Sequence, residues 1–212
     1  MMPEREMSRL SPAAPVCGSG VAAPVPHSAL DALMAMISAC APDSHAHARR
    51  VARYATAIAR TIELPEPLLE QVEQAALLHD IGKLAIPDPE LESDDPLGEL
   101  QASLRRQHVR IAFDIVSVVP QLRPAAGIII AVYERWDGYG YPAGFHKTQI
   151  PIGARIVAVA DAYDVLTASH AWGERGLARD EANAEIVRSA GTYFDPDIVR
   201  AWLRVSDRLD CC

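Results

Sequence analysis

Apolar residues recur at helical spacing along most of the chain, and no segment shows a convincing strand pattern. From Ser44 onward, apolar side chains return every three or four positions, at Val51, Tyr54, Ala55, Ile58 and Ile62. One face of a long amphipathic helix explains this spacing. The step Leu64-Pro65 should end that helix, because a proline inside a helix removes a hydrogen bond and clashes with the preceding turn.

The same periodicity predicts helices on both sides of this one, over about 30–37, 67–79, 97–118, 124–135 and 151–172. Two short helices should follow. The last begins at Asp195-Pro196, where aspartate suits the N-cap and proline suits the first helical position. The predicted fold class is therefore all-α.

The length of 212 residues suits one domain with an appendage, and a hydrophobic content of 50% suffices for a core. Residues 1–28 are rich in Pro, Ala, Gly and Ser without periodicity, so we interpret them as a disordered tail. We expect a short N-terminal helix in 29–43, the main domain in 44–205 and a C-terminal tail in 206–212.

The charge balance and the cysteines restrict partners and location. With 28 acidic against 20 basic side chains, the chain lacks the basic excess of a nucleic-acid-binding protein. The strongly apolar stretch Gly127–Val132 is too short to cross a membrane. No CxxC spacing occurs among the four cysteines, which favours a reducing compartment. We therefore predict a cytoplasmic protein without nucleic-acid or membrane partners.

The sharpest chemical feature is the pair His79-Asp80, which follows the apolar residues Leu77 and Leu78. A carboxylate buried at the end of an apolar helix costs several kcal/mol unless it is paired or its pKa rises. A divalent metal ion removes this conflict, since imidazole and carboxylate are ordinary metal ligands. The alternative is a plain helix C-terminus, where the helix dipole favours histidine and lysine.

Three more polar residues interrupt apolar stretches: His47 at the start of the long helix, His108 on a predicted core face, and Asp161 after the run 156–160. Taken singly, each has a more ordinary explanation: an exposed first-turn residue, a hydrogen-bonded core histidine, or a carboxylate paired with arginine. Several helices that each offer one such group to a shared interior favour a metal site, which helical bundles commonly build in this way.

The order His47, His79-Asp80, Asp161 resembles the signature of the HD superfamily of phosphohydrolases. Within it, the chain is most similar to the HD-GYP group, through the segments HDIGK (79–83), IPD (86–88), RWDGYGYP (135–142), IPIGARIVAVADAYDVLTA (150–168) and FDPDIVRAW (194–202). This resemblance implies an HD-domain helical bundle with a GYP loop. It also implies hydrolysis of cyclic di-GMP, or a related cyclic dinucleotide, in bacterial signalling.

The resemblance further implies roles for individual residues. Divalent ions such as iron or manganese, one or two per chain, would be held by His47, His79, Asp80, His108 and Asp161. Asp80 would bridge two metals, and Lys83 would act with it in catalysis beside the scissile phosphate. Substrate binding would involve Lys83 and the loop residues Gly138, Tyr139, Gly140, Tyr141 and Pro142. The resemblance also implies that this loop could dock proteins such as diguanylate cyclases.

Two departures from the family pattern weaken the multi-metal expectation. Val132 and Tyr133 replace two adjacent histidines, and His146, just after the loop, is the candidate substitute. The segment 168–172, Ala-Ser-His-Ala-Trp, lacks the arginine that would meet a phosphate or guanine. Two hypotheses stay open: a phosphodiesterase weakened by these losses, and a catalytically degenerate domain that binds nucleotides or proteins. A purely structural helical module ranks last.

Overall fold

The computed structural model describes residues 28–86, 99–168 and 176–209, with side chains from residue 106 onward in the second range. The predicted tail 1–28 and the segment 168–172 therefore lie almost wholly outside the described residues. The elements in chain order are α1 (Ala29–Cys40), α2 (Pro42–Thr61), α3 (Glu66–Leu78), η1 (Ile81–Ala85), α5 (Glu99–Ser117), η2 (Pro120–Leu122), α6 (Arg123–Ile129), η3 (Lys147–Gln149), α7 (Ile152–Thr167), α8 (Arg179–Arg188) and α9 (Pro196–Leu209). The described part contains no strand beyond one isolated bridge, which confirms the all-α prediction.

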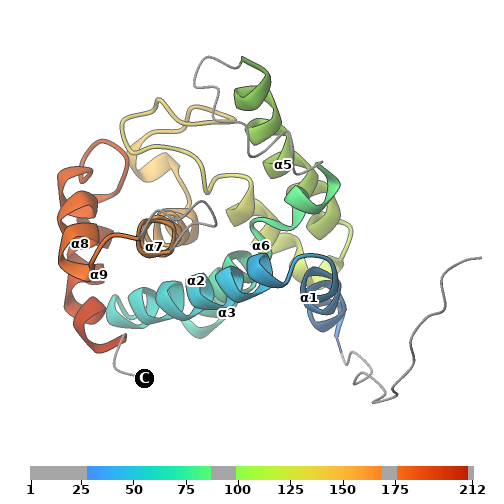
Figure 1. Ribbon diagram of the computed structural model, residues 1–212, viewed down its shortest axis with the longest axis horizontal. Coiled ribbons are helices and arrows are strands. Elements are labelled where there is room, and N and C mark those ends of the chain that lie inside the picture. The colour runs from blue at the N-terminus through green and yellow to red at the C-terminus, as the bar shows by residue number, and fades with distance from the viewer. Residues whose placement is uncertain (1–27, 87–98, 169–175, 210–212) are drawn as a thin grey trace, which may run out of the picture.

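Helix α7 lies near the centre of the molecule and is seen almost end-on in Figure 1. Helices α2 and α3, joined by a short turn, pack together below it, while α8 and α9 cover a second side and α5 and α6 a third. The core between them is aliphatic and alanine-rich, with the buried ring of Trp202 packed against Tyr54 and Tyr163. Small side chains let these helices approach closely, so polar groups on their inner faces come near one another.

The structure corrects the predicted end of α6. Helix α6 stops at Ile129, well before the predicted end near residue 135. The chain continues in tight turns, in which the amide groups of Ala131 and Val132 bond to carbonyls three residues earlier. Helix α9 continues to Leu209, past the predicted domain boundary at 205, because Ser206 is buried and accepts a hydrogen bond from Asn183.

Gly82 allows η1 to touch α5 at the helical turn that carries His108. A methyl group at Gly82 would lie 2.0 Å from the carbonyl oxygen of His108 and 2.8 Å from the amide nitrogen of Ala112. These are backbone atoms that cannot turn aside as a side chain could. The glycine of the HDIGK segment thus fixes the distance between the His79-Asp80 pair and α5.

Gly82→Ala should therefore destabilise the fold by about 1–3 kcal/mol, the usual cost of overpacking, and should shift His108 relative to Asp80. Gly127→Ala on α6 is the matched control, since a methyl group there meets nothing within 4 Å. That variant should be stabilised by roughly 0.5–1 kcal/mol through helix propensity. Thermal or urea unfolding of both variants measures the difference. Equal stability of the two variants would contradict the proposed close contact.

Candidate metal centre

The chain brings four of the predicted ligands together from three helices. His47 comes from the second turn of α2, His79 and Asp80 follow α3, and Asp161 lies on α7. The Nε2 atom of His47 is 3.2 Å from Oδ1 of Asp161 and 3.7 Å from Oδ2 of Asp80. The Nε2 atom of His79 is 3.6 Å from each of the same two oxygens.

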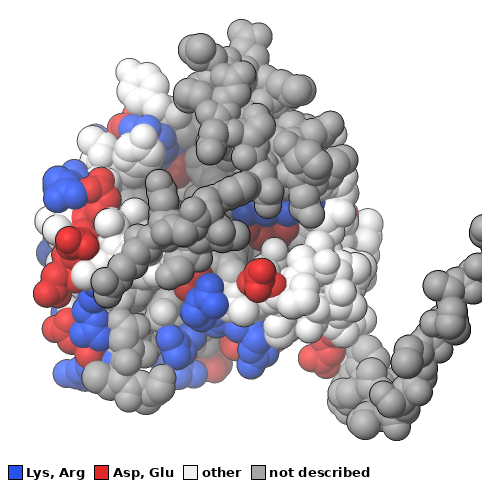
Figure 2. All heavy atoms as spheres, in the orientation of Figure 1, with Lys and Arg blue, Asp and Glu red and all other residues white. Residues whose placement is uncertain are grey.

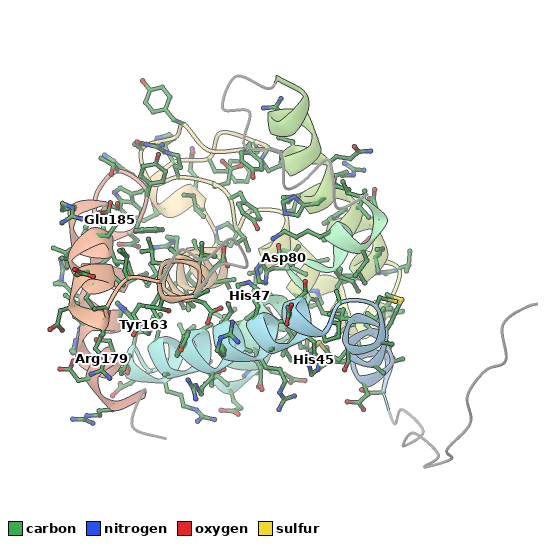
Figure 3. All side chains as sticks on the ribbon, viewed as in Figure 1. His45, His47, Asp80, Tyr163, Arg179 and Glu185 are labelled. Carbon is green, nitrogen blue, oxygen red and sulfur yellow. The ribbon has the colours of Figure 1, made fainter. Side chains whose placement is uncertain are left out.

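His47 and Asp80 face each other across this centre (Figure 3), whereas His45 lies on another side of α2. Two residues correspond to about 200° around a helix, which explains why only one of these histidines turns inward. Ligand atoms of His47, His79 and Asp80 all lie within 4.8 Å of one another, a grouping able to hold a metal ion.

The hydrogen bonds of both histidines leave Nε2 available for an ion. His79 is fully buried, and its Nδ1 lies 2.9 Å from the carbonyl oxygen of Ala76. The Nδ1 atom of His47 lies 2.7 Å from Oδ2 of Asp164. A carbonyl and a carboxylate only accept, so Nδ1 donates in both rings and the neutral ring presents a lone pair at Nε2. Within the described residues, the buried Nε2 of His79 has no hydrogen-bond partner.

The carboxylates give the centre a strongly anionic character. Burial alone would raise the pKa values of Asp80 and Asp161, but neighbouring cations outweigh it and lower both. For Asp80 the opposing charges are His79 and Lys83, and for Asp161 they are the two histidines. Burial likewise lowers the pKa of His47, yet the surrounding carboxylates more than compensate and raise it to about 9. This donor set attracts positive charge and therefore fits a divalent cation.

The other oxygen of Asp80 faces His108 and Tyr133. The hydroxyl of Tyr133 donates to Oδ1 of Asp80 at 3.0 Å, while Nε2 of His108 lies 3.7 Å from the same oxygen. His108 is buried, and burial lowers its pKa to about 4, so its ring is neutral. Burial also raises the pKa of Tyr133 well above its usual value, which keeps the hydroxyl protonated as a donor.

A second ion beside Asp80 would find fewer ligands. Of the two positions where the family has histidines, Val132 is buried in the apolar core and Tyr133 occupies Oδ1 of Asp80 with a hydrogen bond. Among the described residues, His108 is therefore the imidazole that is left near Oδ1 of Asp80. The residues present fit one well-ligated ion, and they do not fit a second ion of comparable ligation. His146 is exposed and forms the N-cap of η3.

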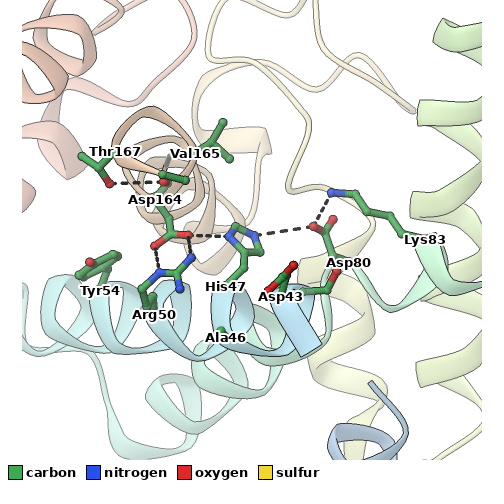
Figure 4. A pocket seen from close by; sticks show the side chains of 12 residues that line it. Asp43, Ala46, His47, Arg50, Tyr54, Asp80, Lys83, Asp164, Val165 and Thr167 are labelled. Carbon is green, nitrogen blue, oxygen red and sulfur yellow. Dashed lines mark hydrogen bonds and ion pairs between the residues drawn. The ribbon is translucent and has the colours of Figure 1, made fainter. Parts of the chain in front are cut away.

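The centre opens into a cavity of about 810 Å³ whose lining includes Asp43, His47, Arg50, Asp80 and Lys83. Figure 4 shows His47 at its middle, between the carboxylates of Asp164 and Asp80. The ammonium group of Lys83 donates to Oδ2 of Asp80 at 2.5 Å. Lys83 thus lies at the mouth of the centre, where its positive charge can meet an anionic group.

The GYP loop approaches the centre through one of its tyrosines. The ring of Tyr141 stacks on that of Tyr133, with centroids 5.5 Å apart and planes at 7°, and the bond from Tyr141 to Pro142 is cis. Tyr139 points outward and is 85% exposed. Gly140 is required here, because a methyl group would lie 2.2 Å from the amide nitrogen of Arg135.

Asp164 and Arg50 belong to the site although the sequence analysis did not select them. Asp164 accepts bonds from His47 and from the guanidinium of Arg50. Burial would raise the pKa of Asp164, but these two donors lower it. A signal existed in the spacing, since Arg50 follows His47 by three positions and Asp164 follows Asp161 by three. Residues so spaced share one helix face.

The metal-free protein should be most stable in mildly acidic solution. The pKa of His47 is raised from 6.5 to about 9, so its stabilising contribution is complete below pH 6.5 and is lost as pH rises toward 9. The lowered pKa values of Asp80 and Asp161 act oppositely, and their contribution is lost as pH falls below 3.8. Thermal midpoints of chelator-treated protein should therefore decline from pH 6.5 to 9, and His47→Gln should weaken that decline. A midpoint that rises over this interval would contradict the assignment.

The surface charges form no single-sign field over the described part of the face shown in Figure 2. On the face shown in Figure 2, acidic and basic side chains are intermixed over α8 and α9, and basic ones gather along the exposed side of α2. Of the helices in the described ranges, none is both long and apolar enough to form a membrane span.

Comparison with known proteins gives consistent matches. The family described as "HD domain" matches residues 31–198. The cyclic di-GMP phosphodiesterase response regulator RpfG of Xanthomonas campestris pv. campestris is 37% identical over 163 residues, which are 76% of this chain and 43% of that protein. A cyclic di-GMP phosphodiesterase of Thermotoga maritima is 34% identical over 169 residues, covering 79% of this chain and 46% of that protein.

A solved structure shares the fold. The crystal structure of a cyclic GMP-AMP specific phosphodiesterase of Vibrio cholerae superposes with a TM-score of 0.63 at 21% identity, covering 84% of this chain and 47% of that one. The chain thus spans less than half the length of these three proteins.

Proposed function

The chain belongs to the HD domain family, in its HD-GYP group, and from this premise we propose that it is a metal-dependent phosphodiesterase acting on cyclic di-GMP or a related cyclic dinucleotide. The observation that carries the proposal is the meeting of two imidazole Nε2 atoms with the carboxylates of Asp80 and Asp161. This cluster of two histidines and two aspartates lies beside a cavity large enough for a nucleotide.

We assign His47, His79, Asp80 and Asp161 as the ligands of one divalent ion, with His108 as a neighbour that reaches Asp80 from the other side. Bound there, an ion such as iron or manganese would polarise a phosphoryl oxygen and supply a nucleophilic hydroxide at neutral pH. A bridging role of Asp80 would use Oδ1, the oxygen that also accepts from Tyr133.

The chain's own cations would receive the substrate. Lys83 and Arg50 both line the cavity, and both are partly exposed in it. Two positive charges beside the metal centre suit a phosphodiester, whose charge grows on the phosphoryl oxygens as water attacks. Arg50 also supplies a permanently charged guanidinium to a cavity whose expected arginine near 169–172 is missing from the sequence. Tyr141 lies elsewhere, in a second pocket of about 260 Å³ that the GYP loop lines together with Tyr133 and Asp161.

The test is metal analysis of the purified full chain, followed by hydrolysis of cyclic di-GMP with added manganese or iron. We expect about one metal ion per chain and a linear dinucleotide product. Cyclic GMP-AMP and a small phosphodiester, bis(p-nitrophenyl) phosphate, define how selective the cavity is. A chain that retains much less than one ion and forms no product from any of the three compounds would refute the enzyme proposal.

The second candidate is a degenerate domain that binds nucleotides or proteins without turnover. The loss of the two family histidines favours it, and so does the outward ring of Tyr139, which offers an aromatic contact to a protein such as a diguanylate cyclase. Nucleotide binding without product would support this reading. For both candidate functions we propose a cytoplasmic location, which the spacing of the cysteines favours.

A further inference from the structure

A continuous chain of hydrogen bonds leads away from the candidate metal centre along one side of the cavity (Figure 4). Asp164 on α7 accepts from Nδ1 of His47 at 2.7 Å. The same carboxylate accepts from Nε of Arg50 at 2.6 Å and from a terminal nitrogen of Arg50 at 2.8 Å. The side chain of Asp164 is only 2% exposed, whereas that of Arg50 is 43% exposed and lines the cavity.

The contact with Asp164 determines both the tautomer and the direction of His47. An ionised carboxylate only accepts hydrogen bonds, so the neutral, metal-binding form of the ring must donate from Nδ1, and its Nε2 then carries the lone pair. The same bond fixes the ring plane, with Nε2 pointing at Asp80 and Asp161. Without Asp164, rotation of the ring or the other tautomer would take this lone pair out of the centre.

Arg50 in turn determines where the carboxylate of Asp164 lies. Its guanidinium engages both oxygens through two bonds, a planar geometry that holds a carboxylate in one orientation. The spacing supports this arrangement, since Arg50 follows His47 by one helical turn and both side chains reach the same partner on α7.

We propose that Asp164, clamped by Arg50, is the positioning residue that presents His47 to a metal ion, so that metal affinity depends on a residue that never touches the metal. The inference rests on the proposed function, because it requires His47 to be a ligand. Groups that orient a metal-binding histidine commonly contribute about 10- to 100-fold in affinity.

The chain contains a matched control. Asp195 is also buried and also accepts from an arginine, with NH1 of Arg155 at 2.6 Å, yet it contacts none of the candidate ligands. Loss of either carboxylate removes a buried ion pair, so both variants should lose stability. Only Asp164→Asn should also alter the tautomer of His47.

The experiment measures the zinc dissociation constant of the full chain by competition with a chelator of known affinity. We expect Asp164→Asn to weaken zinc binding about 10- to 100-fold, and Asp195→Asn to leave it unchanged. Nitrogen-15 NMR of the imidazole groups, recorded above pH 9 where the ring of His47 is neutral, should show its Nδ1 protonated in the wild type and a changed tautomer in Asp164→Asn. Should Asp164→Asn fail to fold, Arg50→Gln, at a partly exposed position, should still lower the affinity severalfold.

Equal zinc affinities of Asp164→Asn and the wild type, or equal losses in Asp164→Asn and Asp195→Asn, would overturn the positioning role. Either result is compatible with a functional metal centre, provided that the wild type binds zinc. If the wild type itself binds no zinc, the proposed function fails and the positioning role fails with it.

Discussion

Asp80→Ala should remove both metal binding and phosphodiester hydrolysis, with a loss in affinity greater than the roughly 100-fold that an outer partner can contribute. The reason is that Asp80 is the common neighbour of three imidazoles, Lys83 and Tyr133. Its two oxygens contact imidazoles from α2, α5 and the end of α3, the ammonium of Lys83 and the hydroxyl of Tyr133. Metal content and turnover of cyclic di-GMP measure the effect.

The control for this experiment is Asp114→Ala, since Asp114 is an exposed carboxylate on α5 that pairs with Arg110. It should keep wild-type metal content and turnover. Circular dichroism should show that Asp80→Ala remains helical. Retention of a full equivalent of metal by folded Asp80→Ala would place the ion elsewhere in the chain.

The double variant Val132→His/Tyr133→His should raise the metal content from about one toward two ions per chain. Its new imidazoles would join His108 and Oδ1 of Asp80, which the Tyr133 hydroxyl no longer occupies. The two positions are not equivalent, because Val132 is buried in the core while Tyr133 already faces Asp80. Tyr133→His alone should therefore give part of the gain at a smaller cost in stability.

Tyr133→Phe tests whether a second ion needs a new imidazole ligand or only the loss of the tyrosine hydroxyl. This variant removes the hydrogen bond to Oδ1 of Asp80 but adds no metal ligand. We expect its metal content to stay near one ion per chain. A second equivalent in Tyr133→Phe would mean that the tyrosine hydroxyl alone excludes the second ion. No gain in the histidine variants would show that the second position has been lost beyond these two substitutions.

Much of the architecture follows from periodicity. The amphipathic pattern gave α2 and α3 with nearly their observed bounds, because burial of one face decides these helices. It failed at α6, where the apolar residues continue through Val132 while the backbone already turns. The spacing of apolar residues predicts which side chains are buried, but it does not distinguish a helix from a tight turn, because both can bury them.

The site was predictable in part. Polar residues inside apolar stretches, together with the family resemblance, selected His47, His79, Asp80 and Asp161, and the structure places them together. Their roles remain proposals. The bond from Tyr133 to Asp80 was not predictable, because a missing histidine says nothing about what its replacement will contact. Neither was the role of Asp164, since i, i+3 spacing is common on any helix.

The stacked rings of Tyr141 and Tyr133 connect the GYP loop to the candidate metal centre through two successive contacts. Tyr141 belongs to the loop, Tyr133 lies beneath it, and the hydroxyl of Tyr133 holds Asp80. Displacement of the loop thus reaches the carboxylate through two contacts. If a protein bound the loop in one position and so changed the metal affinity of the centre, an occupied centre would change the affinity for that protein by the same factor.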